Sequence, residues 1–109
     1  MKNQKEFEQK IKQLQILEYN LQNFLMQKQN LQVQLLEIEN ALKELETVKE
    51  EPYKIVGNIM VKSDKAKLIK ELNSKEEVIE LRLKAIDKQE AELRNKASEL
   101  QQTVLKDMD

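Results

Sequence analysis

Few side chains in this sequence of 109 residues are suited to chemistry, and they form no recognisable constellation. Histidine and cysteine are absent, so the usual general base, thiol nucleophile and soft metal ligands are missing. The single glycine, Gly57, excludes the glycine-rich loops that bind nucleotide phosphates. Adjacent acids such as Glu50-Glu51 and Glu76-Glu77 are typical of solvated helix surfaces. The sequence therefore predicts a protein that is not an enzyme and has no catalytic residue, cofactor or metal.

Charge and hydropathy argue against two further classes of function. Nineteen basic residues against twenty acidic ones give a net charge of -1, which provides no surplus for nucleic acid or an anionic membrane. The longest apolar runs are three residues, far below the roughly 18 that span a bilayer. The first residues lack the apolar stretch of a secretory signal, and no cysteine is available for disulfides. We therefore expect a cytoplasmic protein that binds neither nucleic acid nor membrane.

Long helices must carry the few functional groups, because one glycine and one proline leave little room for turns. From Leu14 to Leu45, positions that alternate three and four residues apart are apolar at nine of ten places, with Lys28 the exception. A seam sustained over more than four heptads predicts a coiled coil rather than an ordinary amphipathic helix. Pro52 removes a helical donor and restricts the residue before it, so we expect this helix at about residues 4–49.

The second half of the chain repeats the pattern. From Ile69 to Val104, nine of eleven positions at the same spacing are apolar. Ser63 or Asp64 can cap the start of this helix by accepting hydrogen bonds from free backbone N–H groups. We expect the helix at about residues 64–107, within a single domain that covers residues 1–109.

The two seams match when the helices fold back on each other, as in Leu45 opposite Ile69. At this register the polar exceptions Lys28 and Glu90 lie one layer apart. Two interpretations stay open for them. They neutralise each other within the seam and fix its register, or their long side chains extend to water.

Between the helices, Tyr53-Lys-Ile-Val-Gly-Asn-Ile-Met-Val-Lys62 predicts a β-hairpin at about residues 53–62 with a type II′ or I′ turn at Gly57-Asn58. Its candidate assembly residues are Tyr53, Ile55, Val56, Gly57, Asn58, Ile59, Met60 and Val61. The pairing places Val56, Ile59 and Val61 on one face and Tyr53, Ile55 and Met60 on the other. An isolated hairpin is marginally stable and leaves two edges unpaired, which favours strands from other chains as its neighbours. The alternative is a hairpin that packs against its own two helices.

At the chain ends the predicted seam degrades, because Lys10 faces Val104 and Phe7 faces Asp107. Exposed apolar groups on a mobile tip suit a protein that binds unfolded chains of many kinds. The alternative is the ordinary fraying of chain ends, where scattered apolar residues need no function. The candidate tip residues are Phe7, Ile11, Leu14, Leu100, Val104, Leu105 and Met108.

The hairpin sequence between two helices of equal length resembles the beta subunits of the prefoldin family, and most of all the archaeal type. The segments Gln27-Lys-Gln-Asn-Leu31, Leu81-Arg-Leu-Lys84 and Lys88-Gln-Glu90 extend the resemblance over essentially the whole chain. It implies a mainly α fold, in which a long antiparallel coiled-coil helical hairpin carries a central two-stranded β-hairpin that joins an intersubunit β-barrel. The implied assembly is a hexamer of two alpha and four beta subunits.

The resemblance also implies a function. Members of the family capture non-native proteins at the coiled-coil tips without ATP and deliver them to a group II chaperonin. The implied partners are an alpha subunit, other beta chains, non-native client proteins and the chaperonin. The alternative function is a structural or tethering coiled-coil oligomerisation protein without client binding, which explains the heptads equally well and the two-faced apolar hairpin poorly.

Overall fold

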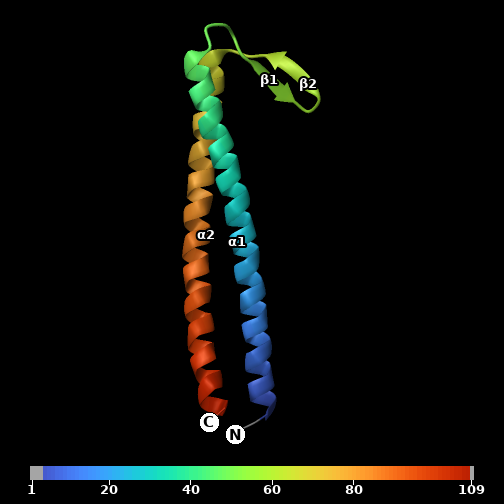
Figure 1. Ribbon diagram of the computed structural model, residues 1–109, viewed down its shortest axis with the longest axis vertical. Coiled ribbons are helices and arrows are strands. Elements are labelled where there is room, and N and C mark those ends of the chain that lie inside the picture. The colour runs from blue at the N-terminus through green and yellow to red at the C-terminus, as the bar shows by residue number, and fades with distance from the viewer. Residues whose placement is uncertain (1–3, 109) are drawn as a thin grey trace. The chain divides into compact units, whose positions relative to one another are not determined.

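The computed structural model describes residues 4–108, which form two long helices and one β-hairpin. Their order is α1 (Gln4–Thr47), β1 (Tyr53–Val56), β2 (Ile59–Lys62) and α2 (Lys65–Met108), as Figure 1 shows. The predicted mainly α class, with a two-stranded hairpin between two long helices, is confirmed. Each helix end lies within two residues of the bound expected from the sequence.

Local hydrogen bonds explain where the two helices end and begin. At the end of α1, the Thr47 hydroxyl donates to the Glu44 carbonyl at 3.0 Å, and Lys65 Nζ donates to the Val48 carbonyl at 2.9 Å. At the start of α2, Asp64 Oδ1 accepts from the Ala66 N–H at 3.1 Å. Asp64 is therefore the N-cap, one of the two candidates that the sequence offered.

The hairpin has the register that the sequence predicts. Strands β1 and β2 are antiparallel, and Val56 pairs with Ile59 next to the turn. Gly57 has a φ of 62°, whereas no residue other than glycine has a positive φ in the part of the chain that the structure describes. A positive φ at the first turn residue alone is the geometry of a type II′ turn. Glycine adopts this φ without the steric strain that a Cβ would bring.

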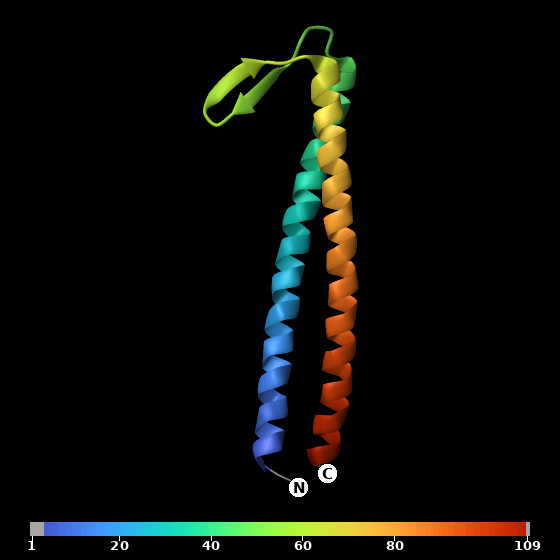
Figure 2. The ribbon, with the colours of Figure 1, turned by 180° about the vertical axis from the view of Figure 1, so that it is seen from behind.

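The chain divides into two compact units, and each helix contributes to both. We call residues 4–29 and 84–108 the terminal unit, and residues 30–83 the hairpin unit. Within each unit the segments of α1 and α2 run antiparallel side by side, as Figures 1 and 2 show. In residues 4–108, neither helix has the length and apolar content needed to cross a membrane.

The core of each unit follows the predicted seam. Leu31, Leu45 and Ile79 are buried in the hairpin unit, and Ile86 and Val104 are buried in the terminal unit. Every seam position from 14 to 45 and from 69 to 104 is buried or half-buried. The periodicity of apolar residues therefore predicts the face by which the helices pair.

Candidate functional site

The β-hairpin is the most exposed apolar surface of the hairpin unit. Its large apolar side chains are exposed on both faces, and Ile55 reaches 71% exposure. The exposed residues are Tyr53, Ile55, Val56, Ile59, Met60 and Val61. Within residues 4–108 the sheet has only two strands, so each strand has one edge without a neighbouring strand. The alternative in which the hairpin packs against its own helices is wrong, because neither face is covered.

Two polar contacts fix the base of this hairpin. The Ser63 N–H donates to the Pro52 carbonyl at 2.9 Å and joins the two chain segments just outside the strands. Lys54 Nζ of β1 donates to Glu71 Oε2 of α2 at 2.8 Å. No pattern in the sequence indicates the second contact, because Lys54 and Glu71 are ordinary charged residues on separate elements. The hairpin is thus fastened at its base while its apolar side chains stay exposed.

The contact between Lys54 and Glu71 predicts a pH dependence of the hairpin. The hydrogen bond from Lys54, followed by its positive charge, lowers the pKa of the Glu71 carboxyl. Any stabilisation from this pair is complete above the ordinary pKa of glutamate, about 4.3, and is lost as pH falls through the lower pKa of the folded state. We expect the protection factor of the Ser63 amide hydrogen to fall modestly in that acidic range, because both side chains are partly exposed.

Hydrogen exchange, corrected for intrinsic rates, measures this protection factor. The matched control is Glu71→Gln, which keeps the size of the side chain and removes its titration. An equal loss of protection with pH in the variant would show that another group is responsible.

A cluster of charges interrupts the seam of the terminal unit. Lys28 Nζ lies 2.7 Å from Asp87 Oδ1 and 3.7 Å from Glu90 Oε1. Glu90 is 8% exposed and is also 3.3 Å from Arg94 Nη2. The Asp87 hydrogen bond is the main cause that raises the pKa of Lys28.

These distances decide between the two interpretations of Lys28 and Glu90. Glu90 does not extend to water, because it is buried and has two cations near its carboxylate. Lys28 and Glu90 therefore approach each other as the sequence indicated, but Asp87 is the closer partner of Lys28. The sequence pattern missed Asp87 and Arg94 because both lie outside the seam positions.

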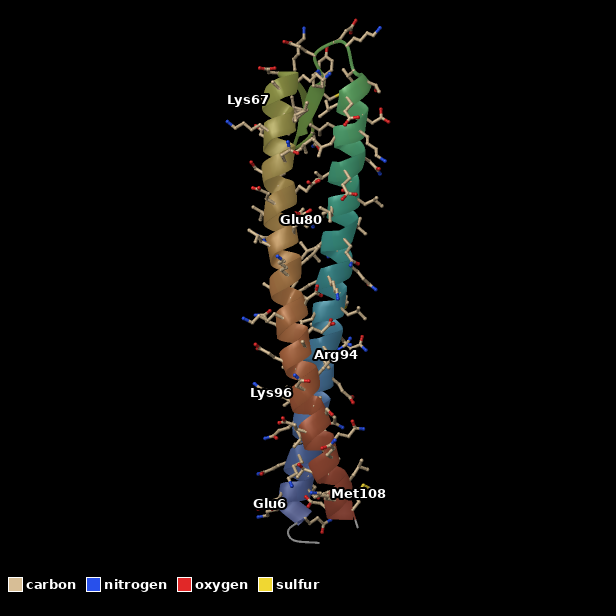
Figure 3. All side chains as sticks on the ribbon, turned by 90° about the vertical axis from the view of Figure 1, so that its left-hand side faces the viewer. Glu6, Lys67, Glu80, Arg94, Lys96 and Met108 are labelled. Atoms are coloured by element: carbon tan, nitrogen blue, oxygen red, sulfur yellow. The ribbon has the colours of Figure 1, made fainter. Side chains whose placement is uncertain are left out.

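The candidate tip residues differ in exposure. Leu105 and Met108 are 57% and 65% exposed, whereas Val104 is only 5% exposed. The remaining four, Phe7, Ile11, Leu14 and Leu100, are half-buried. Figure 3 shows Met108 near the end of α2, at the same end of the terminal unit as Glu6 of α1.

The expected degradation of the seam at this end is confirmed for Leu105 and Met108, which are exposed, and is wrong for Val104, which is buried. Lys10 Nζ lies 2.7 Å from Asp107 Oδ2, one helical turn beyond Val104, so the lysine has an anion as its partner. The exposed apolar part of the tip is therefore Leu105 and Met108.

Apolar side chains outside the seam form a surface that the sequence pattern missed. Ile16 and Tyr19 are exposed on α1 within the terminal unit. Ile16 lines a groove of about 480 Å³ together with Leu17 and Leu100, which are seam residues of α1 and α2. The signal was present in the sequence, because Ile16 stands directly beside a seam position and is not polar.

Comparisons with known proteins give consistent results. Residues 8–108 match the family model described as "Prefoldin subunit". The chain is similar to "Prefoldin subunit beta" of Thermococcus onnurineus, at 44% identity over 84% of this chain and 81% of that protein. It is 43% identical to "Prefoldin subunit beta" of Archaeoglobus fulgidus over the same shares. It also resembles the crystal structure of the prefoldin beta subunit from Thermococcus strain KS-1, with a TM-score of 0.84, 36% identity, and coverage of 95% of this chain and 94% of that one.

Proposed function

Because this chain belongs to the prefoldin family and is similar to its beta subunits throughout, we propose that it is a subunit of an ATP-independent molecular chaperone that captures non-native proteins. The family is one of chaperones, and its model matches both helices and the hairpin of this chain. That match over residues 8–108 is the observation that carries the proposal.

The first step of the proposed function is assembly through the β-hairpin. The hairpin joins those of an alpha subunit and of further beta chains in an intersubunit β-barrel, within a hexamer of two alpha and four beta subunits. Support comes from the hairpin itself, because its apolar faces are exposed and both of its edges are unpaired. Closure into a barrel pairs the edges, and neighbouring chains cover the faces.

The second step is capture of a non-native client by the tip of the terminal unit. Leu105 and Met108 are the foremost candidates, because they are exposed apolar residues in the last turn of α2. Long flexible side chains such as methionine repack around different partners, which suits a binder of varied clients. Delivery of the client to a group II chaperonin in the cytoplasm completes the proposed function.

Capture proceeds without nucleotide in this proposal. The only glycine of the chain, Gly57, occupies the turn of the hairpin, so the chain has no glycine-rich loop whose N–H groups would cradle a phosphate.

Co-elution with a denatured client tests the proposal. The complex of this chain with its alpha partner is mixed with fluorescent, reduced and carboxymethylated α-lactalbumin, and is then separated by size-exclusion chromatography with and without ATP. We expect the label to elute with the complex in equal amounts in both conditions, and native α-lactalbumin to elute alone. A complex that leaves the denatured client free fits the tethering coiled coil instead, and a complex that needs ATP contradicts the proposed mechanism.

A further inference from the structure

Side-chain amides belong to half of the residues that line a second groove in the terminal unit. It has a volume of about 360 Å³ and lies between the two helices of that unit. Asn20, Asn23 and Gln27 of α1 and Gln89 of α2 contribute four carboxamides to its lining. Phe24 and Leu93, both half-buried seam residues, are the apolar part of the lining.

These carboxamides have hydrogen-bonding capacity that the fold leaves unused. Within residues 4–108, none of the four side chains makes a hydrogen bond with another residue. Each carboxamide carries an oxygen that accepts and an NH₂ group that donates. Asn20 and Asn23 are half-buried, and none of their polar side-chain atoms is buried without a partner, so these groups stay accessible to water or to a ligand.

The helix itself does not explain the two asparagines. Both stand in the interior of α1, where asparagine is a poor helix former because its side chain competes with the backbone for hydrogen bonds. The amides therefore weaken the helix slightly, and their donors and acceptors stand in the lining of the groove.

The charges of the lining residues indicate which class of ligand the groove binds. Glu92 and Lys96 contribute one negative and one positive charge, so the groove favours neither an anion such as a phosphate nor a cation. An extended polypeptide has a neutral main chain with alternating N–H donors and C=O acceptors. Carboxamides complement both groups, and such a main chain is the same in every sequence.

We propose that this carboxamide groove, defined by Asn20, Asn23, Gln27 and Gln89 around Phe24 and Leu93, binds an extended segment of client main chain. The amides hydrogen-bond to the client's main-chain N–H and C=O groups. Phe24 and Leu93 contact whichever apolar side chain of the client lies in the groove. The inference rests on the proposed capture of non-native proteins and adds the chemistry of recognition. A folded protein has already paired its main-chain groups, so the groove distinguishes unfolded chains from folded ones.

A variant that removes the amides and keeps the apolar surface tests this inference. The substitutions are Asn20→Leu, Asn23→Leu, Gln27→Met and Gln89→Met, which replace amides by apolar groups of similar size. If capture rests on apolar contact alone, this variant binds more tightly than the natural chain. We expect it to bind denatured α-lactalbumin about tenfold more weakly, because about one net hydrogen bond is worth that factor.

The matched control also replaces two asparagines by leucine and two glutamines by methionine, at exposed positions outside the carboxamide groove and outside the groove lined by Ile16. These substitutions are Asn30→Leu, Asn95→Leu, Gln22→Met and Gln29→Met. We expect the assembled complex of the control variant to retain the affinity of the natural complex. Circular dichroism and the mass of each complex establish that both variants fold and assemble.

A second measurement uses the unaltered complex, so its outcome does not depend on how a variant folds. A short, apolar fluorescent peptide is compared with the same peptide N-methylated at alternate residues, which lacks half of the N–H donors. We expect at least about tenfold weaker binding of the methylated peptide, from the loss of one or more net hydrogen bonds. Equal binding of the two peptides, or a groove variant that binds clients as tightly as the control variant, overturns the carboxamide inference alone. A natural complex that binds neither client nor peptide overturns the proposed function as well.

Discussion

Replacing Ile59 by aspartate is expected to dissociate the assembly of this chain with its partners while the helices remain folded. Ile59 is 66% exposed in the chain by itself, so a carboxylate at this position stays hydrated and costs the single chain little. In an intersubunit barrel the same carboxylate is removed from water without a partner, at a cost of several kcal/mol. Light scattering coupled to size-exclusion chromatography measures the mass, and circular dichroism measures the helix content.

The matched control for this prediction is Leu81→Asp. It places the same charge on α2 of the hairpin unit, at a side chain that is as exposed as Ile59, at 66%. We expect the control complex to keep its full mass. An Ile59→Asp complex of unchanged mass would show that the hairpin is not the assembly element.

The double variant Leu105→Gln with Met108→Gln is expected to weaken client capture while it keeps its assembly. Both side chains are mostly exposed, so their replacement removes little packing within the chain. Each offers a client on the order of 1 to 3 kcal/mol when it is buried, and several subunits acting together multiply the effect of weak contacts. We expect capture of denatured α-lactalbumin to fall at least roughly fivefold, a loss of about 1 kcal/mol.

The control for the tip variant is Val33→Gln with Leu36→Gln. These residues are exposed to a similar degree, at 55% and 57%, but they belong to the hairpin unit. We expect this control to capture the client as the natural complex does. If the tip variant captures the client equally well, the binding surface lies elsewhere, and the grooves between the helices become the better candidates.

Local patterns in the sequence were sufficient for the elements of the fold. The spacing of three and four residues marks the buried face, because Leu31, Leu45 and Ile79 all fall on it and are buried. The dipeptide Gly57-Asn58 sets the register of the hairpin, because a two-residue turn leaves only one way to pair the strands. Both inferences depend on neighbours within a few residues along the chain.

The contacts between charged groups could not be predicted from these patterns. Lys28 binds Asp87 and Lys10 binds Asp107, and each contact depends on the axial offset of one helix against the other. A shift of a few residues exchanges one acidic partner for another without moving any apolar residue out of the seam. The sequence pattern therefore did not identify Asp107 as the partner of Lys10, and it did not indicate that Val104 is buried.

The candidate site could be predicted from the sequence only in part, because some of its residues come together only in the folded chain. The exposed hairpin followed from its two apolar faces, which two helices cannot cover. The carboxamide groove was missed because Asn20, Asn23 and Gln27 lie outside the seam and resemble ordinary surface residues in the sequence. These residues line one groove only together with Gln89 of α2, which is distant from them in the sequence.

Aggregation of a denatured client tests the central claim of ATP-independent capture most directly. Citrate synthase is diluted from guanidinium chloride into buffer without nucleotide, and light scattering is followed with the complex of this chain and its alpha partner at increasing ratios. We predict that scattering falls progressively and is suppressed once the complex is in modest excess over the client. Scattering that rises as fast with the complex as with an equal mass of native serum albumin would contradict the account.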